Sequence, residues 1–263
     1  MLPGVVTFYG PPGSAKSTHA LSWPKPIAGY DQDNGMDRAW GYQKLVDDGD
    51  LIVRRISIPL KSMTQRYVTL EGFTEAWQRF SDSVQADLEN PSIKTISVDT
   101  GSTLWAMDRD GYMEEVQKES HTQRKQLIEI EYGEPNRRLD LLYNAAKLHK
   151  KHLVVTHHET DEYVPVIGPD GEPILDENRK QVSVKSGKKV PEGFRHTKAN
   201  SDWMLYTYLA ETSDGIKPHA VIKKSGYGFD LVNQDIDIFS ERQNDKEGLY
   251  GILERRLKVL GRL

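Results

Sequence analysis

A strand-like run at the start of the chain leads directly into a loop rich in glycine and proline. Residues 4–9 read Gly-Val-Val-Thr-Phe-Tyr, and their β-branched and aromatic side chains favour a strand. The next nine residues are Gly10, Pro11, Pro12, Gly13, Ser14, Ala15, Lys16, Ser17 and Thr18. Gly10, Lys16 and Ser17 fit the Walker A pattern, which asks for Gly, four residues, Gly-Lys and then Ser or Thr. The pattern predicts a phosphate-binding loop followed by a helix that starts near Lys16.

The residue types in this loop suit phosphate chemistry. Successive backbone N–H groups can form a cradle for an anion, and the N-terminus of the following helix adds more donors. We expect Lys16 to reach the β- and γ-phosphates of a nucleotide and Ser17 to bind Mg²⁺. Ala15 stands where the pattern has its second Gly, so it is strained if this position needs a positive φ and harmless if it is helical. The alternative for the whole segment is an ordinary Gly/Pro turn.

The composition limits the class of protein. The chain has 263 residues, a formal net charge of −4 and no cysteine, which leaves no disulfides or thiolate metal sites. No apolar run approaches the length of a membrane span and no secretory signal is visible, so we expect a cytoplasmic protein that makes no membrane contact. The net charge argues against a uniformly basic nucleic-acid coat but leaves room for a local basic patch. We expect one domain over residues 1–263.

Strand-like and helix-like segments alternate along the chain. The segments expected to form strands are 4–9, 26–31, 51–58, 94–99, 152–157, 202–209 and 219–223. The segments expected to form helices, besides the one near Lys16, are 36–47, 71–89, 102–118, 136–150 and 246–260, the last opening a C-terminal segment, 246–263. This alternation predicts an α/β fold with a mostly parallel central sheet and flanking helices.

Polar residues follow the ends of three expected strands, where the ligand crevice of a doubly wound sheet lies. Asp99 is expected to bind Mg²⁺ beside Ser17, although any strand can end in Asp. Asp33 can orient the water that attacks the γ-phosphate, and an Asp/Asn/Gly turn at Asp31–Gly35 is an equally good interpretation. His157 or His158 can contact the γ-phosphate, and the alternative is a polar surface residue.

Residues 160–200 are expected to be an inserted β-hairpin or mobile loop, because a Gly-Pro-Asp-Gly turn signal at 168–171 has strand-like pieces on both sides. Residues 178–200 carry seven basic side chains against Glu192 alone. Such a loop suits single-stranded DNA, and the alternative is a solvated loop. The DNA-binding candidates are Lys180, Lys185, Lys188, Lys189, Arg195 and Lys198. Further on, Lys223 and Lys224 can reach the γ-phosphate of a neighbouring subunit, or form an ordinary strand end.

The order of these parts resembles the RecA-like ATPase core, and more narrowly the compact phage ATPases of the Sak type, which act in single-strand annealing and recombination. The resemblance covers about residues 3–230. The segments that carry it are Gly10–Thr18, Asp31–Gly35, Ile96–Thr100, Tyr132–Arg137 and Val154–Glu159.

The resemblance implies a RecA-like fold, ATP with Mg²⁺, and a catalytic base two residues after the Asp that ends the second strand, which is Asp33. Relatives commonly have Glu there, so hydrolysis is expected to be slow. The resemblance also implies a γ-phosphate sensor at His157 or His158, single-stranded DNA along 160–200, and a homo-oligomeric ring or filament with Lys223 and Lys224 acting in trans. A single-strand-binding protein is a further candidate partner.

Three functions fit these observations. The first is a DNA-stimulated ATPase of phage recombination, annealing or replication. The second is a nucleotide-operated assembly or loading factor that hydrolyses ATP weakly and acts through a protein partner. The third is a small-molecule kinase, for which the sequence contains no acceptor motif. ATP hydrolysis that responds to DNA would favour the first function, and a nucleotide-dependent change in oligomer size without DNA stimulation would favour the second.

Overall fold

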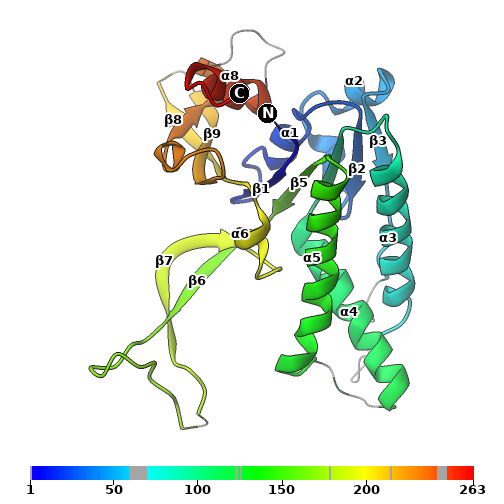
Figure 1. The fold of residues 1–263 in the computed structure, drawn as a ribbon, viewed down its shortest axis with the longest axis vertical. Coiled ribbons are helices and arrows are strands. Elements are labelled where there is room, and N and C mark those ends of the chain that lie inside the picture. The colour runs from blue at the N-terminus through cyan, green and yellow to red at the C-terminus, as the bar shows by residue number, and fades with distance from the viewer. Residues whose placement is uncertain are drawn as a thin grey trace.

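A computed structural model describes residues 2–59, 70–121, 124, 126–177, 179–213, 215–241 and 248–263. An eight-stranded sheet forms its centre, in the spatial order β10-β9-β8-β1-β5-β4-β2-β3 (Figure 1). The strands of this sheet are β1 (Val5–Tyr9), β2 (Ile27–Asp31), β3 (Leu51–Arg54), β4 (Thr95–Asp99), β5 (His152–His157), β8 (Trp203–Thr212), β9 (Gly215–Ser225) and β10 (Asp235–Asp237). The six strands from β8 to β3 in this order run parallel, and β9 and β10 add an antiparallel edge.

Helices cover both faces of the sheet, and apolar side chains from the two faces form separate cores. The helices are α1 (Lys16–Ala20), α2 (Tyr42–Asp47), α3 (Phe73–Glu89), α4 (Gly101–Ser120), α5 (Gly133–Leu148), α6 (Thr197–Asn200), α7 (Ile238–Glu241) and α8 (Leu249–Val259). On one face, α3, α4 and α5 pack over strand residues such as Val98 and Val155. On the other, α1 and α8 pack over Phe8 and Leu205. This confirms the expected α/β fold with a mostly parallel sheet and flanking helices.

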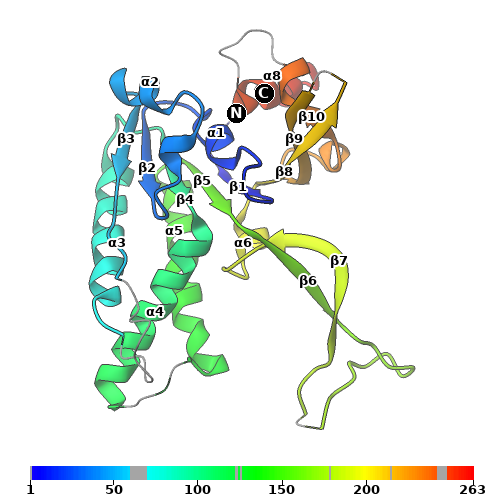
Figure 2. The same ribbon diagram turned by 180° about the vertical axis from the view of Figure 1, so that it is seen from behind.

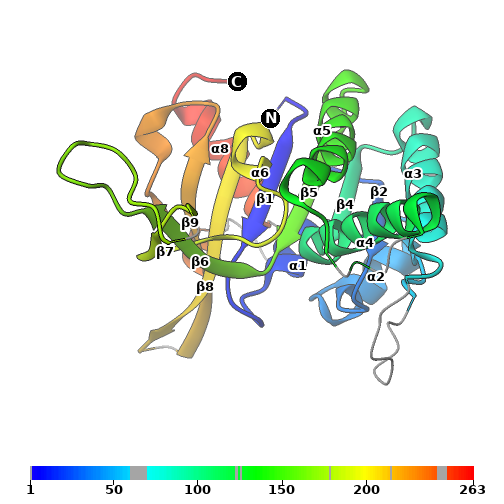
Figure 3. The ribbon, with the colours of Figure 1, turned by 90° about the horizontal axis from the view of Figure 1, so that it is seen from below.

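The inserted segment forms a long two-stranded hairpin of β6 (Glu159–Pro165) and β7 (Ser183–Pro191). It extends away from the sheet and its helices (Figures 1 and 2). Seen from below, it points away from α3, α4 and α5 (Figure 3). The β6–β7 ladder, together with isolated bridges between Ile167 and Pro173 and between Leu175 and Gln181, confirms the expected β-hairpin.

Smaller differences from the expected elements have local causes. The segment 36–47 divides at Gly41, whose φ is 80°, so only Tyr42–Asp47 is α-helical. The strand expected over 51–58 ends at Arg54, where pairing with β2 stops. The C-terminal helix begins at Leu249, and residues 246 and 247 lie outside the described residues. No helix in the described ranges is long and apolar enough to span a membrane.

Candidate functional site

The predicted phosphate-binding loop connects β1 to α1, which begins at Lys16 as the sequence predicts. Gly10 opens the loop against β8, and a Cβ at this position would lie 2.2 Å from the Thr207 carbonyl oxygen. The Ser14 hydroxyl is 2.7 Å from the Thr207 hydroxyl, which ties the middle of the loop to the same strand. Gly10 is therefore required by close packing, and the position of the loop is set by β8 as well as by β1.

Ala15 adopts φ 63° and ψ 21°, the left-handed conformation. A non-glycine residue in this region costs roughly 1–2 kcal/mol because its Cβ crowds the backbone. The structure therefore answers the question that the sequence left conditional: this position has the positive φ for which the Walker A pattern carries Gly, and Ala15 is strained there.

Lys16 is buried, and its ammonium donates to the carbonyl oxygens of Gly10 at 2.9 Å and Pro11 at 2.8 Å. Burial lowers the pKa of Lys16, while the carboxylates of Asp99, Glu159 and Asp33 act in the opposite direction. Three acidic side chains from different parts of the chain are thus within electrostatic reach of this lysine. The predicted nucleotide-binding loop and the predicted Asp33 and Asp99 come together at one edge of the sheet.

Asp99 ends β4 and is 3 % exposed. Its Oδ1 accepts a hydrogen bond from the Thr156 hydroxyl, while its Oδ2 has no hydrogen-bond partner among the described residues. Burial raises the pKa of Asp99, and a side-chain hydrogen bond with Ser17 acts against this. A buried carboxylate oxygen without a partner next to a hydroxyl is a suitable pair of ligands for Mg²⁺. Among the described residues no group of three His, Asp or Glu could hold a metal ion.

The acidic segment after β2 combines turn formation with an exposed carboxylate. Asp31 is buried and its Oδ1 accepts from the Gly35 N–H at 3.0 Å. Asp33 is exposed and its Oδ1 accepts from the same N–H at 3.1 Å. The turn interpretation of this segment therefore holds at both residues. A role for Asp33 as the catalytic base stays a prediction, and its charge does reach Lys16 and Asp99.

Sequence reasoning assigned no role to Gln32, which lies between these two aspartates. Its side chain is 7 % exposed, and neither its amide nitrogen nor its amide oxygen has a hydrogen-bond partner within the described part of the chain. Its backbone N–H donates to the Asp99 carbonyl oxygen at 2.6 Å, which ties the end of β2 to the end of β4. The sequence feature that could have identified Gln32 as a site residue is its position, as a polar side chain, directly after a buried strand.

His157 ends β5, and its ring is fully buried against Gly101 at the start of α4. Its Nδ1 is 2.9 Å from the Glu192 carbonyl oxygen. Because a carbonyl oxygen only accepts, Nδ1 carries the proton and Nε2 presents a lone pair. Burial lowers the pKa of His157 to about 4, so the ring is neutral at physiological pH. In this arrangement Nε2 can accept a hydrogen bond from water, but it cannot donate one to a phosphate.

His158 is half-buried, and its backbone N–H donates to the Ser102 hydroxyl at 3.0 Å. The structure thus fixes the backbone at this position through the first turn of α4. Of the two histidines proposed as a γ-phosphate sensor, His158 is the one whose ring is not held by a hydrogen bond to Glu192. The sensor role stays a prediction for both residues.

The two candidate trans-acting lysines lie in different surroundings. Lys224 pairs in the sheet with Met204, near the start of β8 and therefore at the edge opposite the phosphate loop. Its ammonium donates to the carbonyl oxygens of Lys198 at 2.7 Å and Ala199 at 3.2 Å, where it stabilises the end of α6. Lys223 is exposed, with its ammonium 6.0 Å from the centre of the Tyr206 ring. The trans role stays a prediction, for which Lys224 would have to leave these carbonyl groups.

The hairpin brings acidic and basic residues together. Lys185 and Lys189 both contact the Asp161 carboxylate, at 2.7 and 2.8 Å. Residues 159–191 carry more acidic than basic side chains. The acidic ones are Glu159, Asp161, Glu162, Asp170, Glu172, Asp176 and Glu177, and the basic ones are Arg179, Lys180, Lys185, Lys188 and Lys189. The excess of positive charge in 178–200 is therefore offset by the acidic residues of 159–177, which precede it in the chain.

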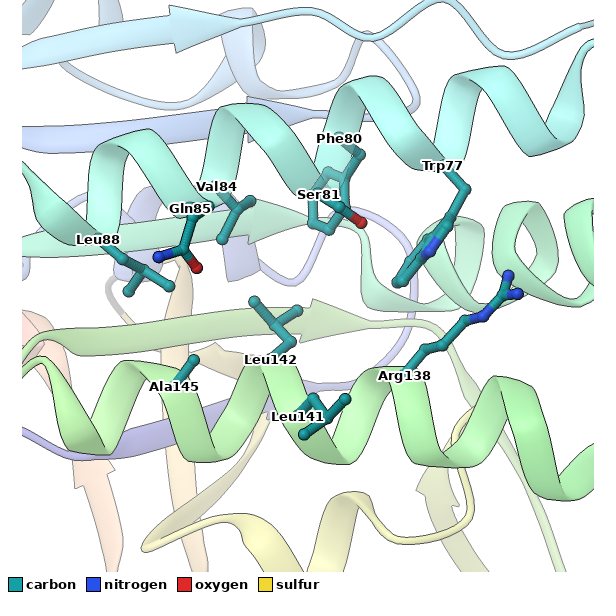
Figure 4. A pocket seen from close by; sticks show the side chains of 10 residues that line it. All are labelled: Trp77, Phe80, Ser81, Val84, Gln85, Leu88, Arg138, Leu141, Leu142 and Ala145. Carbon is teal, nitrogen blue, oxygen red and sulfur yellow. The ribbon is translucent and has the colours of Figure 1, made fainter.

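A groove between α3 and α5 lies apart from all of these residues (Figure 4). Its volume is about 260 Å³, and Trp77, Phe80, Leu141 and Arg138 are among its lining residues. The side chains on its walls are mostly apolar, and none of the predicted nucleotide-binding residues lines it.

Comparisons with known proteins give little beyond this geometry. No protein-family model matches the chain, and no curated protein matches it. Among solved structures, a KaiC-like protein, PH0186, from the hyperthermophilic archaeon Pyrococcus horikoshii OT3 is similar with a TM-score of 0.44 and 10% sequence identity. The match covers 85% of this chain and 80% of that chain. At that score the similarity adds nothing to what the strand order and the site geometry show.

Proposed function

We propose that this protein is a RecA-like P-loop ATPase that binds ATP with Mg²⁺ at the edge of the sheet where β1, β2, β4 and β5 end. The observation that supports it most is the convergence of the phosphate loop with Asp99 and Ser17. An unpartnered Asp99 oxygen beside the Ser17 hydroxyl, next to a buried lysine, is what a Mg²⁺-nucleotide site requires.

The chain's own residues have distinct roles in this proposal. The loop N–H groups and the N-terminus of α1 bind the phosphates, and Lys16 exchanges its two carbonyl partners for phosphate oxygens. Asp99 and Ser17 would hold the metal ion, which would supply positive charge near the transferred phosphoryl group. Asp33 is the carboxylate that the family resemblance assigns to the attacking water. The strain at Ala15 fits slow turnover.

ATP turnover in Mg²⁺ and in EDTA tests this function directly, with Ser17→Ala as the variant and Ser92→Ala, at an exposed serine outside the loop, as the control. Ser17→Ala is expected to need much more Mg²⁺ for the same rate. Turnover that is indifferent to EDTA, or equal loss in both variants, would speak against the proposed metal site.

We further propose that the hairpin acts on single-stranded DNA. Lys188 on the hairpin, and Arg195 and Lys198 just after it, support this proposal because their side chains are exposed, whereas Lys185 and Lys189 are held by the Asp161 carboxylate. ATP turnover with and without single-stranded DNA, at low and high salt, is the test. Stimulation that falls steeply with salt is expected if the phosphate backbone binds here.

The assembly or loading factor is the second candidate, and a different observation favours it. Large apolar side chains are exposed on the hairpin, among them Tyr163 at 59%, Ile167 at 53% and Leu175 at 56%. Exposed apolar groups of this size suit a protein partner better than a phosphate backbone. A nucleotide-dependent change in molecular mass, measured by light scattering, together with turnover indifferent to DNA would favour this candidate.

A further inference from the structure

Glu159 is an acidic residue at the base of the hairpin to which the sequence patterns assigned no role. It is the first residue of β6, and His158 alone separates it from the end of β5. Tyr9 pairs in register with His157 across the parallel strands β1 and β5. Glu159 comes two residues beyond that pair, and the phosphate loop begins directly after Tyr9. The hairpin therefore starts level with the loop that carries Lys16.

The Glu159 carboxylate is placed among groups of the nucleotide site. Burial lowers the pKa of Lys16 and the charge of Glu159 acts against this, whereas for Tyr9 burial raises the pKa and the charge of Glu159 adds to the increase. Burial raises the pKa of Tyr206, and Glu159 adds to this by its charge and through a side-chain hydrogen bond. The carboxylate is therefore within electrostatic reach of the phosphate-loop lysine and close to Tyr206, the β8 residue that pairs with Tyr9 at the end of β1.

One oxygen of this carboxylate lacks a partner. Glu159 Oε2 is shielded from solvent and makes no hydrogen bond with any described residue. A buried acceptor left unpaired is unfavourable, and more so when it is charged. Asp99 Oδ2 and His157 Nε2 are unpaired in the same way, and both belong to the same edge of the sheet. The free acceptors indicate that this part of the site is built to receive hydrogen-bond donors.

We propose that Glu159 is a catalytic carboxylate that accepts a hydrogen bond from the water attacking the γ-phosphate; this rests on the ATPase function proposed above. The water oxygen forms a bond to the γ-phosphorus. The bond from that phosphorus to the β,γ-bridging oxygen breaks, and its electron pair leaves on ADP. The proton of the water passes to Glu159 and from there to the released phosphate.

The backbone around Glu159 is better fixed than that around Asp33. Glu159 pairs with Pro191 in the hairpin ladder, and the Glu192 N–H donates to the His158 carbonyl oxygen at 2.8 Å. The Glu192 carbonyl oxygen in turn accepts from Ser102 at 3.2 Å and from His157. Asp33, in contrast, is exposed in a turn. A carboxylate that is already held in position orients water with a smaller loss of entropy. Because Glu159 is part of β6, a movement of the hairpin base would also move the carboxylate.

Glu159→Gln tests this role, because Gln keeps the size of the side chain but removes its charge. We expect the kcat of ATP hydrolysis to fall about 100-fold or more. The Kd for a fluorescent non-hydrolysable ATP analogue should stay within about threefold of the wild-type value. Glu159→Asp should retain part of the activity, and Glu172→Gln, an exposed carboxylate near the hairpin tip, should match the wild type.

The outcomes separate this inference from the ATPase proposal. If the wild type hydrolyses ATP and Glu159→Gln does so within about threefold, only the role of Glu159 is wrong. Equal losses of binding and of kcat, or a loss of thermal stability that accounts for the inactivity, would also overturn it. A wild type that binds the analogue but does not hydrolyse ATP would overturn the proposed function, and the role of Glu159 with it.

Discussion

Polar groups at the proposed nucleotide edge of the sheet, where β1, β2, β4 and β5 end, are buried and partly unpaired. Polar groups along the β6–β7 hairpin beyond Glu159 are half-buried or exposed, and several of them pair with one another. At the edge, Asp99, Gln32 and His157 are all less than a tenth exposed, and each has a polar atom without a partner among the described residues. In the hairpin, the Asp161 carboxylate forms ion pairs with two lysines, and the Glu162 carboxylate accepts a hydrogen bond from the Ser186 hydroxyl.

The difference separates two kinds of charge. Buried, unpaired groups cost folding free energy, so their presence at one edge indicates a site that a ligand completes. Exposed paired groups cost little and indicate less about function, because surface ion pairs contribute about 0–1 kcal/mol each. The nucleotide edge is therefore the stronger basis for a functional assignment, and the hairpin charge is the weaker one.

The largest expected effect comes from Asp99, the proposed metal ligand. Asp99→Asn keeps the shape and the Thr156 hydrogen bond but removes the negative charge that Mg²⁺ requires. We expect turnover to fall about 100-fold or more. Asp82→Asn, on the exposed face of α3, is the control and should be neutral. Equal turnover of the two variants at limiting Mg²⁺ would contradict the claim that the buried Asp99 contributes to turnover more than the exposed Asp82 does.

Packing of the loop against β8 gives the next largest effect. Gly10→Ala places a Cβ 2.2 Å from the Thr207 carbonyl oxygen, so the loop has to move. Gly13→Ala meets no atom within 4 Å, although its φ of 78° still disfavours a side chain. We expect Gly10→Ala to abolish nucleotide binding and Gly13→Ala to cost about 1 kcal/mol of unfolding free energy. Fluorescent nucleotide titration measures binding by both variants, and urea unfolding measures their stability. Stronger loss of nucleotide binding in Gly13→Ala than in Gly10→Ala would contradict the role of Gly10 packing.

Acid is expected to destabilise the sheet before the hairpin. Burial lowers the pKa of His19 to about 4, below its ordinary value of 6.5. Because the unfolded chain binds the proton more readily, this stability is complete above pH 6.5 and is lost as the pH falls toward 4. The loss is up to about 1.4 kcal/mol per pH unit for each such histidine.

His152 and His157 behave in the same way as His19, and residues 159–191 contain no histidine. Urea unfolding at pH 7.5 and pH 5, with His19→Phe as the variant, measures the effect. A variant whose stability depends on pH as steeply as that of the wild type would rule out His19 as a source.

Relief of backbone strain gives a smaller effect. Ala15→Gly removes the Cβ from a left-handed position, which gains roughly 1–2 kcal/mol, offset by the greater freedom of Gly in the unfolded chain. We expect a net stabilisation of about 1 kcal/mol or less in urea unfolding. A destabilised variant would show that the loop does not hold this conformation in solution.

The smallest expected effect concerns the hairpin charge. Asp161→Asn releases Lys185 and Lys189 from their shared carboxylate. If the hairpin binds single-stranded DNA, affinity at low salt should rise a few-fold and the salt dependence should become steeper. Fluorescence anisotropy of a labelled oligonucleotide measures both. An unchanged affinity would favour the protein-partner function over the DNA function.

The sequence was sufficient where the site depends on contiguous residues. The start of α1 at Lys16, the strand that ends at Asp99 and the parallel sheet all followed from local patterns. It was insufficient where one residue depends on another far along the chain. The protonated nitrogen of His157 is set by Glu192, and the environment of Glu159 is set by Tyr206.

The charge of the inserted segment shows the same dependence on distant residues. Residues 178–200 are basic when counted alone, but the hairpin pairs residues 183–191 among them with β6, which carries Glu159, Asp161 and Glu162. Ala15 is an intermediate case, since the pattern identified the unusual residue and only the backbone conformation showed that it is strained.

Phosphate release from ATP by the wild type and by Lys16→Ala, in Mg²⁺ and at equal protein concentration, tests the central claim most directly. The nucleotide edge described above predicts Mg²⁺-dependent hydrolysis by the wild type and none above background in Lys16→Ala, with both proteins folded by circular dichroism. Hydrolysis at the same rate in Lys16→Ala, or no ATP binding by the wild type, would contradict it.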